Sequence, residues 1–185
     1  ILAVLYSSRA NLPVIFSPVQ LLFINLLTDS LPSIAVGVEP KNEDILDEKP
    51  RDPNESILTK RFSSKLLIEG VLIAVFIIIA FYIGLKDSAL KGSTMAFATL
   101  CLARLFHGID YRGQRNVFAI GFFKNKFSLI AFAIGFVLLN LVLLVPSVYS
   151  MFGITKIEPI NFLEIYLLSL IPTILVQIYK AIKYR

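Results

Sequence analysis

The stretch that most constrains this chain is the apolar run from Pro18 to Pro40, PVQLLFINLLTDSLPSIAVGVEP. It is long enough to cross the roughly 30 Å hydrocarbon core of a bilayer as a helix, yet it carries Asn25, Thr28 and Asp29 near its middle. A carboxylate at that depth costs about 2.5–3.5 kcal/mol on insertion scales, so such residues are usually kept for a function. The run is therefore predicted to be a membrane helix with a functional polar centre.

The three polar residues are predicted to share one helix face. At 100° per residue, Asn25, Thr28 and Asp29 fall within about 100° of arc. Pro32 lacks the N–H that would bond the carbonyl of Thr28, so the helix should loosen there and leave a free carbonyl. Such oxygens suit calcium, magnesium, manganese or sodium, and interrupted helices mark binding sites in transporters. The pattern favours ion transport; the alternative is a polar seam that joins helices.

The composition indicates a membrane protein. Apolar residues make up 56% of the 185 residues, above the roughly 45–50% of ordinary soluble domains. A segment at 1–8 is too short to span a bilayer, and because the sequence begins at Ile1 it is expected to be the end of a helix that starts upstream. We predict an all-α, polytopic transmembrane helix bundle over 1–185, with this N-terminal partial helix and five full spans. The five predicted spans are 18–38, 66–85, 93–109, 127–149 and 160–179.

The positive charge is placed asymmetrically along the chain. Thirteen of the 18 Lys and Arg residues lie in 39–65, 110–126 and 180–185, whereas the opposite connections hold only four. The excess predicts that these three segments are cytoplasmic in a multi-pass protein of the cell membrane. Because the basic residues orient helices, we expect the lipid bilayer and a transported cation as partners, and no nucleic acid.

The segment 39–65 is the only long polar connection. It carries seven acids, six bases and three prolines, a composition that disfavours a buried helix. Its length suits docking against another soluble domain, and a flexible connector is the alternative.

Several polar residues lie inside or at the edge of the predicted spans. Arg104 is expected either to extend to the headgroups or to point into the bundle and interact with Asp29 or with a carboxylate of a helix outside this sequence. Glu69 and His107 are expected at headgroup level near the cytoplasmic edge, and His107 is not expected to be a metal ligand.

Small residues and one amide predict where helices meet. Gly70 with Ala74, and Ala131 with Gly135, have the small-xxx-small spacing that allows close helix contact. Asn140 is expected to bond to a neighbouring helix.

Motifs for covalent or nucleotide chemistry are absent from the sequence. It has no GxxxxGK[ST] phosphate loop, no HExxH, no CxxC and no Ser/His/Asp set. The lone Cys101 cannot form a disulfide within the chain. We therefore expect no catalytic residues, no bound cofactor and no ATP hydrolysis by this chain alone.

The run 18–53 resembles the C-terminal membrane part of cation-transporting P-type ATPases, most of all the calcium pumps of the sarcoplasmic-reticulum type and their bacterial relatives. The family's sixth transmembrane helix has the pattern PVQLLWxNLxTDxxPA, and a cytoplasmic loop with DIMxxPPR follows it. The resemblance covers essentially the whole chain, from the end of the fifth helix through the tenth. Its motifs are PVQLLFINLLTDSLP (18–32), GVEP (37–40), DILDEKPRDP (44–53) and STMAF (93–97).

The resemblance implies a role for each of the three polar residues in the predicted span 18–38. Asn25, Thr28 and Asp29 fall on the family's ion-coordinating positions, and the remaining ligands would come from helices outside this sequence and from the eighth helix. Calcium would be the transported ion, while ATP and magnesium would be bound by other domains of the intact protein. The loop 39–60 would contact the phosphorylation domain. Since calcium takes 6–8 oxygen ligands, the chain alone should bind it weakly or not at all.

One residue departs from the family pattern. Aligning TMAF puts Arg104 where two-site calcium pumps have an acidic ligand, and a guanidinium there would repel a second cation. We hypothesise that the intact pump carries one divalent cation per cycle and that Arg104 is the charge substitute for the second ion. A same-family pump for sodium, proton or manganese and a secondary transporter or channel remain alternatives, whereas a purely structural subunit would not need Asp29.

Overall fold

The computed structural model describes residues 1–38, 58–110, 117, 121 and 123–183. Within these ranges the side chains of Arg61 and of residues 27–29 are not described. The described part is all helical and contains no strand, which confirms the predicted fold class. The elements are α1 (Leu2–Arg9), α2 (Pro18–Phe23), the π-helical turn η1 (Ile24–Asp29), α3 (Ser30–Gly37), α4 (Lys60–Leu85), α5 (Ala89–Asp110), α7 (Lys126–Leu144), the 3-10 turn η3 (Pro146–Val148), α8 (Tyr149–Phe152) and α9 (Pro159–Lys183).

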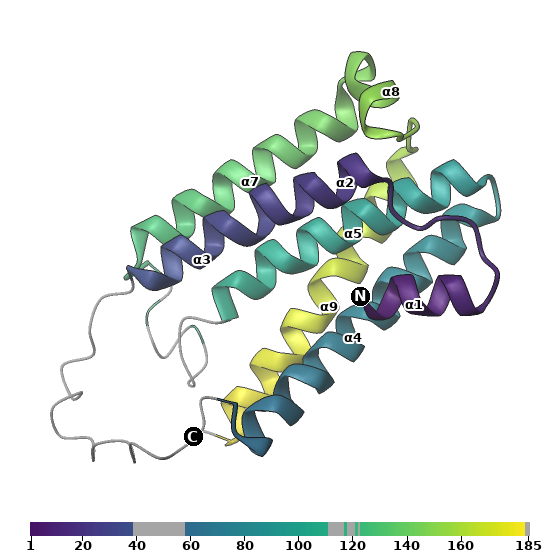
Figure 1. Ribbon diagram of the computed structural model, residues 1–185. Helices are drawn as coiled ribbons and strands as arrows, with labels where there is room; N and C mark the ends of the chain where they lie inside the picture. The colour runs from purple at the N-terminus through teal and green to yellow at the C-terminus, as the bar shows by residue number, and fades with distance from the viewer. Residues whose placement is uncertain (39–57, 111–116, 118–120, 122, 184–185) are drawn as a thin grey trace, which may run out of the picture.

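The long helices form an up-and-down bundle (Figure 1). The segments α2, η1 and α3 follow one another as a single rod beside α7, and α5 lies next to them. The ends of α3, α5 and α9 and the starts of α4 and α7 lie together at one end of the bundle, here called the base. The rod from α2 to α3 and helix α5 therefore run in the same direction.

Within the described ranges, four helical segments are long and apolar enough to cross a membrane: Pro18–Gly37, Phe62–Leu85, Lys126–Leu144 and Pro159–Lys183. Between 20% and 33% of each apolar window is buried inside the bundle, so most of each helix surface faces outward, as expected for contact with lipid. The remaining predicted span, 93–109, corresponds to α5, whose 22 residues are enough for about 33 Å of helix. It is less apolar because it is the central helix, with most of its residues buried against its neighbours.

Side-chain caps define the ends of the helices. Ser17 and Gln20 form a capping box at the start of α2, with Pro18 as the first helical residue. Asn125 accepts a hydrogen bond from the N–H of Ser128 at 2.9 Å and so caps α7, while its Nδ2 donates to the carbonyl of Ala35 at 2.9 Å. The same side chain thus begins α7 and joins it to α3 at the base.

Small residues let α4 and α5 approach closely. A Cβ added to Gly84 would lie 2.7 Å from the carbonyl oxygen of Lys91 and 2.8 Å from Cα of Gly92, so only glycine fits there. The predicted contact at Gly70 is wrong, because a Cβ on Gly70 would meet nothing within 4 Å. The prediction for Gly135 is confirmed, since a Cβ there would lie 2.6 Å from a methyl of Leu105 on α5.

Polar and aromatic contacts join the other helices. The Tyr166 hydroxyl donates to Oδ1 of Asn140 at 2.8 Å, which confirms that Asn140 bonds to a neighbouring helix, here α9. Gln20 is fully buried, and its Nε2 donates to the carbonyls of Phe152 and Gly153, each at 3.2 Å. Phe23 packs edge-on against Phe152 with ring centroids 5.5 Å apart. These contacts join α2 to α8 at the end opposite the base.

Candidate cation site and a buried polar cluster

The helix that carries the predicted cation ligands changes its winding at the predicted place. Ile24–Asp29 forms a π-helical turn, and the Ser30 hydroxyl donates to the carbonyl of Asn25 at 3.1 Å. Pro32 lies just beyond this turn, so the loosened helix expected from the sequence takes the form of a widened turn rather than a break. Asn25 is exposed. The side chains of Thr28 and Asp29 lie outside the described part of the structure, so the shared face stays a prediction.

Helix α5 contacts the rod formed by α2, η1 and α3, at a point one turn closer to the base than the π-helical turn. A Cβ added to Gly108 would lie 2.9 Å from Cβ of Pro32, so the two helices are in direct contact there. The two helices run in the same direction. One turn before Gly108 on α5 is Arg104, and one turn before Pro32 on the rod is Thr28, so these two residues lie at the same level. Arg104 is partly buried and lies within about 40° of the Gly108 face at 100° per residue. The backbone therefore places Arg104 at the level of the predicted cation ligands.

A second polar group lies at the base, between α4 and α5. Nδ1 of His107 lies 3.0 Å from Oδ2 of Asp110, and Nε2 lies 3.3 Å from Oε2 of Glu69. All three residues are buried, with exposed fractions of 4%, 4% and 7%. Lys65 lies at the edge, with Nζ 3.7 Å from Oε1 of Glu69. We call His107, Asp110 and Glu69 the carboxylate–histidine cluster.

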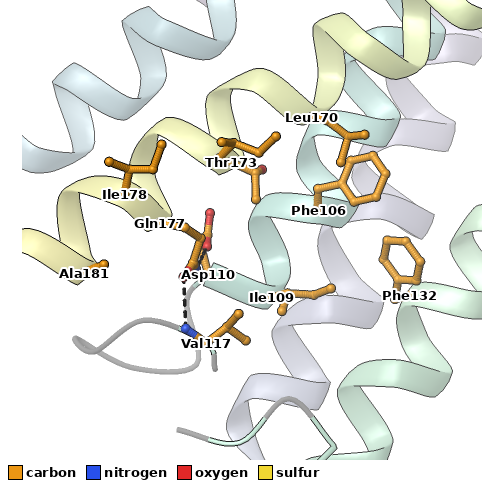
Figure 2. A pocket seen from close by; sticks show the side chains of 11 residues that line it. Phe106, Ile109, Asp110, Val117, Phe132, Leu170, Thr173, Gln177, Ile178 and Ala181 are labelled. Carbon is orange, nitrogen blue, oxygen red and sulfur yellow. Dashed lines mark hydrogen bonds between the residues drawn. The ribbon is translucent and has the colours of Figure 1, made fainter. Parts of the chain in front are cut away.

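Helix α9 completes this region. Lys180 is buried, with 2% exposed, and donates to the backbone carbonyl of Asp110 at the end of α5. A cation at this position also suits the negative end of the helix dipole. Gln177 donates to the carboxylate of Asp110 and accepts from the N–H of Val117 at 3.0 Å, as Figure 2 shows. The base of the bundle is thus held by polar contacts among α4, α5 and α9.

One sequence prediction is wrong at this point. Glu69 does not extend outward to the headgroups; it faces His107 inside the bundle, because each side chain offers the other a partner that lipid cannot supply. His107 is buried, and its level relative to the headgroups stays a prediction. The cluster as a whole was not predicted. The only signal in the sequence is the spacing of His107 and Asp110, three residues apart on one helix, since Glu69 lies 38 positions away from the histidine.

An apolar groove of about 680 Å³ lies beside the cluster, between α5, α7 and α9 (Figure 2). Its walls include Phe106, Phe132 and Ile174, and its polar edge is formed by Asp110 and Gln177. These two side chains already bond to each other. The groove suits hydrocarbon rather than a cation.

The structure brings together only part of the predicted machinery. Among the described residues, no three His, Cys, Asp or Glu side chains are arranged to hold a metal ion. The loop 39–60, predicted to contact a phosphorylation domain, falls on residues 39–57 that lie outside the described part. The case for the predicted cation site therefore depends on the π-helical turn and on the position of Arg104 along α5.

Comparison with known proteins agrees with the resemblance seen in the sequence. Among curated proteins, the calcium-transporting ATPase of Bacillus subtilis is 33% identical over 178 residues, which are 95% of this chain and 20% of the relative. A calcium-transporting ATPase of Listeria monocytogenes is 41% identical over 140 residues, 75% of this chain and 16% of the relative. The calcium-transporting ATPase type 2C member 1 of Mus musculus is 32% identical over 119 residues, 63% and 13% respectively.

The chain spans about a fifth of the length of the Bacillus relative. The model of the family described as "Cation transporting ATPase, C-terminus" matches residues 13–182, from the residues before α2 almost to the end of α9. This match includes the π-helical turn, all four apolar spans and the central α5. The chain therefore belongs to the cation-transporting ATPase family, as its C-terminal membrane region.

Proposed function

We propose that this chain is the C-terminal membrane part of an ATP-driven calcium pump and that Asn25, Thr28 and Asp29 contribute ligands to the transported ion. The observation that carries the proposal is the π-helical turn Ile24–Asp29 inside a membrane-spanning segment. Single π-helical turns within α-helices occur frequently at functional sites, because the extra residue changes the direction of side chains and carbonyls. The similarity to proteins named calcium-transporting ATPases supports calcium as the ion.

The position of Arg104 supports a single ion per cycle. Its backbone lies at the level of Thr28, one turn above the contact between Gly108 and Pro32. A permanent positive charge at that depth disfavours a second divalent cation. We propose that Arg104 takes the place of that second ion.

The rest of the polypeptide would supply the energy. ATP and magnesium would bind to other domains, and the loop 39–60 would transmit the state of the phosphorylation domain to the membrane helices. In this arrangement the base of the bundle lies at the cytoplasmic side of the cell membrane. The excess of Lys and Arg in 39–65, 110–126 and 180–185 favours this orientation.

The test is ATP-dependent uptake of radiolabelled calcium by the full-length protein in vesicles. Asp29→Asn keeps the size of the side chain but removes its charge, and we expect uptake to be lost. Asp87→Asn is the matched control, because Asp87 lies in the short turn between α4 and α5 and bonds to Lys91. Undiminished uptake by Asp29→Asn would remove Asp29 from the ligand set.

Stoichiometry tests the role of Arg104 separately. We expect about one calcium ion per ATP, because the guanidinium occupies the second position. A value near two for the intact pump would refute this role. Uptake of manganese or sodium in place of calcium would favour a pump of the same family for a different ion.

A further inference from the structure

The carboxylate–histidine cluster has an arrangement that a neutral histidine cannot satisfy while both carboxylates are ionised. Both ring nitrogens of His107 face carboxylates, at 3.0 Å to Asp110 and 3.3 Å to Glu69. A neutral imidazole carries one N–H and one lone pair, whereas an ionised carboxylate only accepts hydrogen bonds. In the neutral form, one nitrogen would therefore direct its lone pair at a carboxylate oxygen.

The charges around the cluster lead to the same conclusion. In the part of the chain that the structure describes, the buried carboxylates of Glu69 and Asp110 carry two negative charges, and the buried ammonium of Lys180 carries one positive charge. Lys65, on α4, lies at the edge with 38% of its side chain exposed. An uncompensated buried charge is strongly disfavoured. An additional proton on His107 places a positive charge directly between the two carboxylates and supplies the second N–H donor.

We propose that Glu69, His107 and Asp110 form a proton-binding site at the base of the bundle, in which His107 is held as an imidazolium between the two carboxylates. The bound proton joins two helices, since Glu69 belongs to α4 while His107 and Asp110 belong to α5. Lys180 and Gln177 attach α9 to the same aspartate. Proton occupancy therefore sets how firmly α4 is bound to α5 at the base.

His107 lies on a different face of α5 from the contact between α5 and α3. None of Asn25, Thr28 and Asp29 belongs to the carboxylate–histidine cluster, and His107 lies about 100° around α5 from the Gly108 face that meets Pro32. A metal ion fits poorly, because both nitrogens of His107 already face carboxylates as hydrogen-bond partners. The inference does not depend on the proposed pump function.

The test is nitrogen NMR of the full-length protein, labelled with 15N-histidine and held in lipid nanodiscs at pH 7.5. His107 is the only histidine in this chain. The difference from a His107→Gln variant identifies its signal among any others in the longer polypeptide. The 15N chemical shifts of the ring distinguish an imidazolium from the neutral tautomers. We expect the imidazolium in the wild type and a neutral ring in both Glu69→Gln and Asp110→Asn.

Glu158→Gln is the matched control, because Glu158 is an exposed carboxylate at the start of α9, away from the base. This variant should keep the imidazolium. A neutral His107 in the wild type overturns the proposal, and so does an imidazolium that persists in either cluster variant. If His107→Gln does not fold, the wild-type spectrum still decides, since the absence of any imidazolium at pH 7.5 refutes the site without a variant.

Discussion

Replacing Gly108 by alanine should push α5 away from α3. The new Cβ would lie 2.9 Å from Cβ of Pro32 and 3.5 Å from its Cγ. Ordinary carbon–carbon contacts are about 3.5–4.0 Å, so the shortest distance is too small by roughly 1 Å. The proline ring is part of the backbone of α3 and cannot rotate away.

The expected cost follows from two opposing terms. Overpacking of this kind destabilises by about 1–3 kcal/mol. Replacing glycine by alanine within a helix returns about 0.5–1 kcal/mol. We therefore expect Gly108→Ala to lower the free energy of unfolding by about 1 kcal/mol, within a range of roughly 0–2.5 kcal/mol.

Thermal unfolding in nanodiscs measures this cost, and Gly70→Ala is the matched control. Gly70 lies inside α4, and a Cβ there meets nothing within 4 Å. That variant should be more stable than the wild type by about 0.5–1 kcal/mol, because only the helix-propensity term remains.

The same pair of variants tests the link to transport. The contact between Gly108 and Pro32 lies one turn below Thr28, so separating α5 from α3 should displace the proposed ligands. We expect Gly108→Ala to weaken the apparent affinity for calcium during uptake, while Gly70→Ala leaves it unchanged. Wild-type stability and wild-type affinity in Gly108→Ala would refute both the close contact and its connection to the site.

Three further variants test the packing of the bundle by thermal unfolding. Gly84→Ala should cost about 2–2.5 kcal/mol, the upper end of overpacking less the gain from alanine in a helix. The new Cβ meets only backbone, 2.7 Å from the carbonyl oxygen of Lys91, and stability within about 0.5 kcal/mol of the wild type would contradict this. Tyr166→Phe should cost about 0.6–1.7 kcal/mol, since it removes the bond to Asn140, and a double-mutant cycle with Asn140→Leu that shows no coupling would exclude the bond. Gln20→Leu should cost about 1–3 kcal/mol, because it leaves the carbonyls of Phe152 and Gly153 without their side-chain donor. Gln20→Glu should not restore the lost stability, because a carboxylate cannot donate a hydrogen bond.

The sequence contains enough information to predict the elements that depend on local chemistry. Apolar length predicts the spans, Ser17 and Pro18 mark the start of α2, and Pro32 predicts a disturbed helix at the level where η1 is found. Asn140 is predicted to bond across helices because an amide in an apolar helix needs a partner. In each case the cause lies within a few residues of the effect.

Contacts between distant segments could not be predicted in the same way. The small-xxx-small spacing fits Gly70 as well as Gly135, but only the packing of the bundle decides which glycine meets a neighbour. Glu69 and His107 belong to different spans, so each alone resembles an edge residue, and their pairing depends on how α4 and α5 align. The roles of Thr28 and Asp29 as cation ligands stay predictions, which the uptake assay with Asp29→Asn tests.

The central position of α5 has a consequence for how the protein is made. This helix carries Lys91, Arg104 and Asp110, and it is not among the four segments apolar enough to enter a bilayer unaided. Only the short turn 86–88 separates it from the strongly apolar α4, and Gly84 brings the two helices into backbone contact. We expect the translocon to insert them together as a hairpin, so that the most polar helix enters the lipid already shielded by its neighbour.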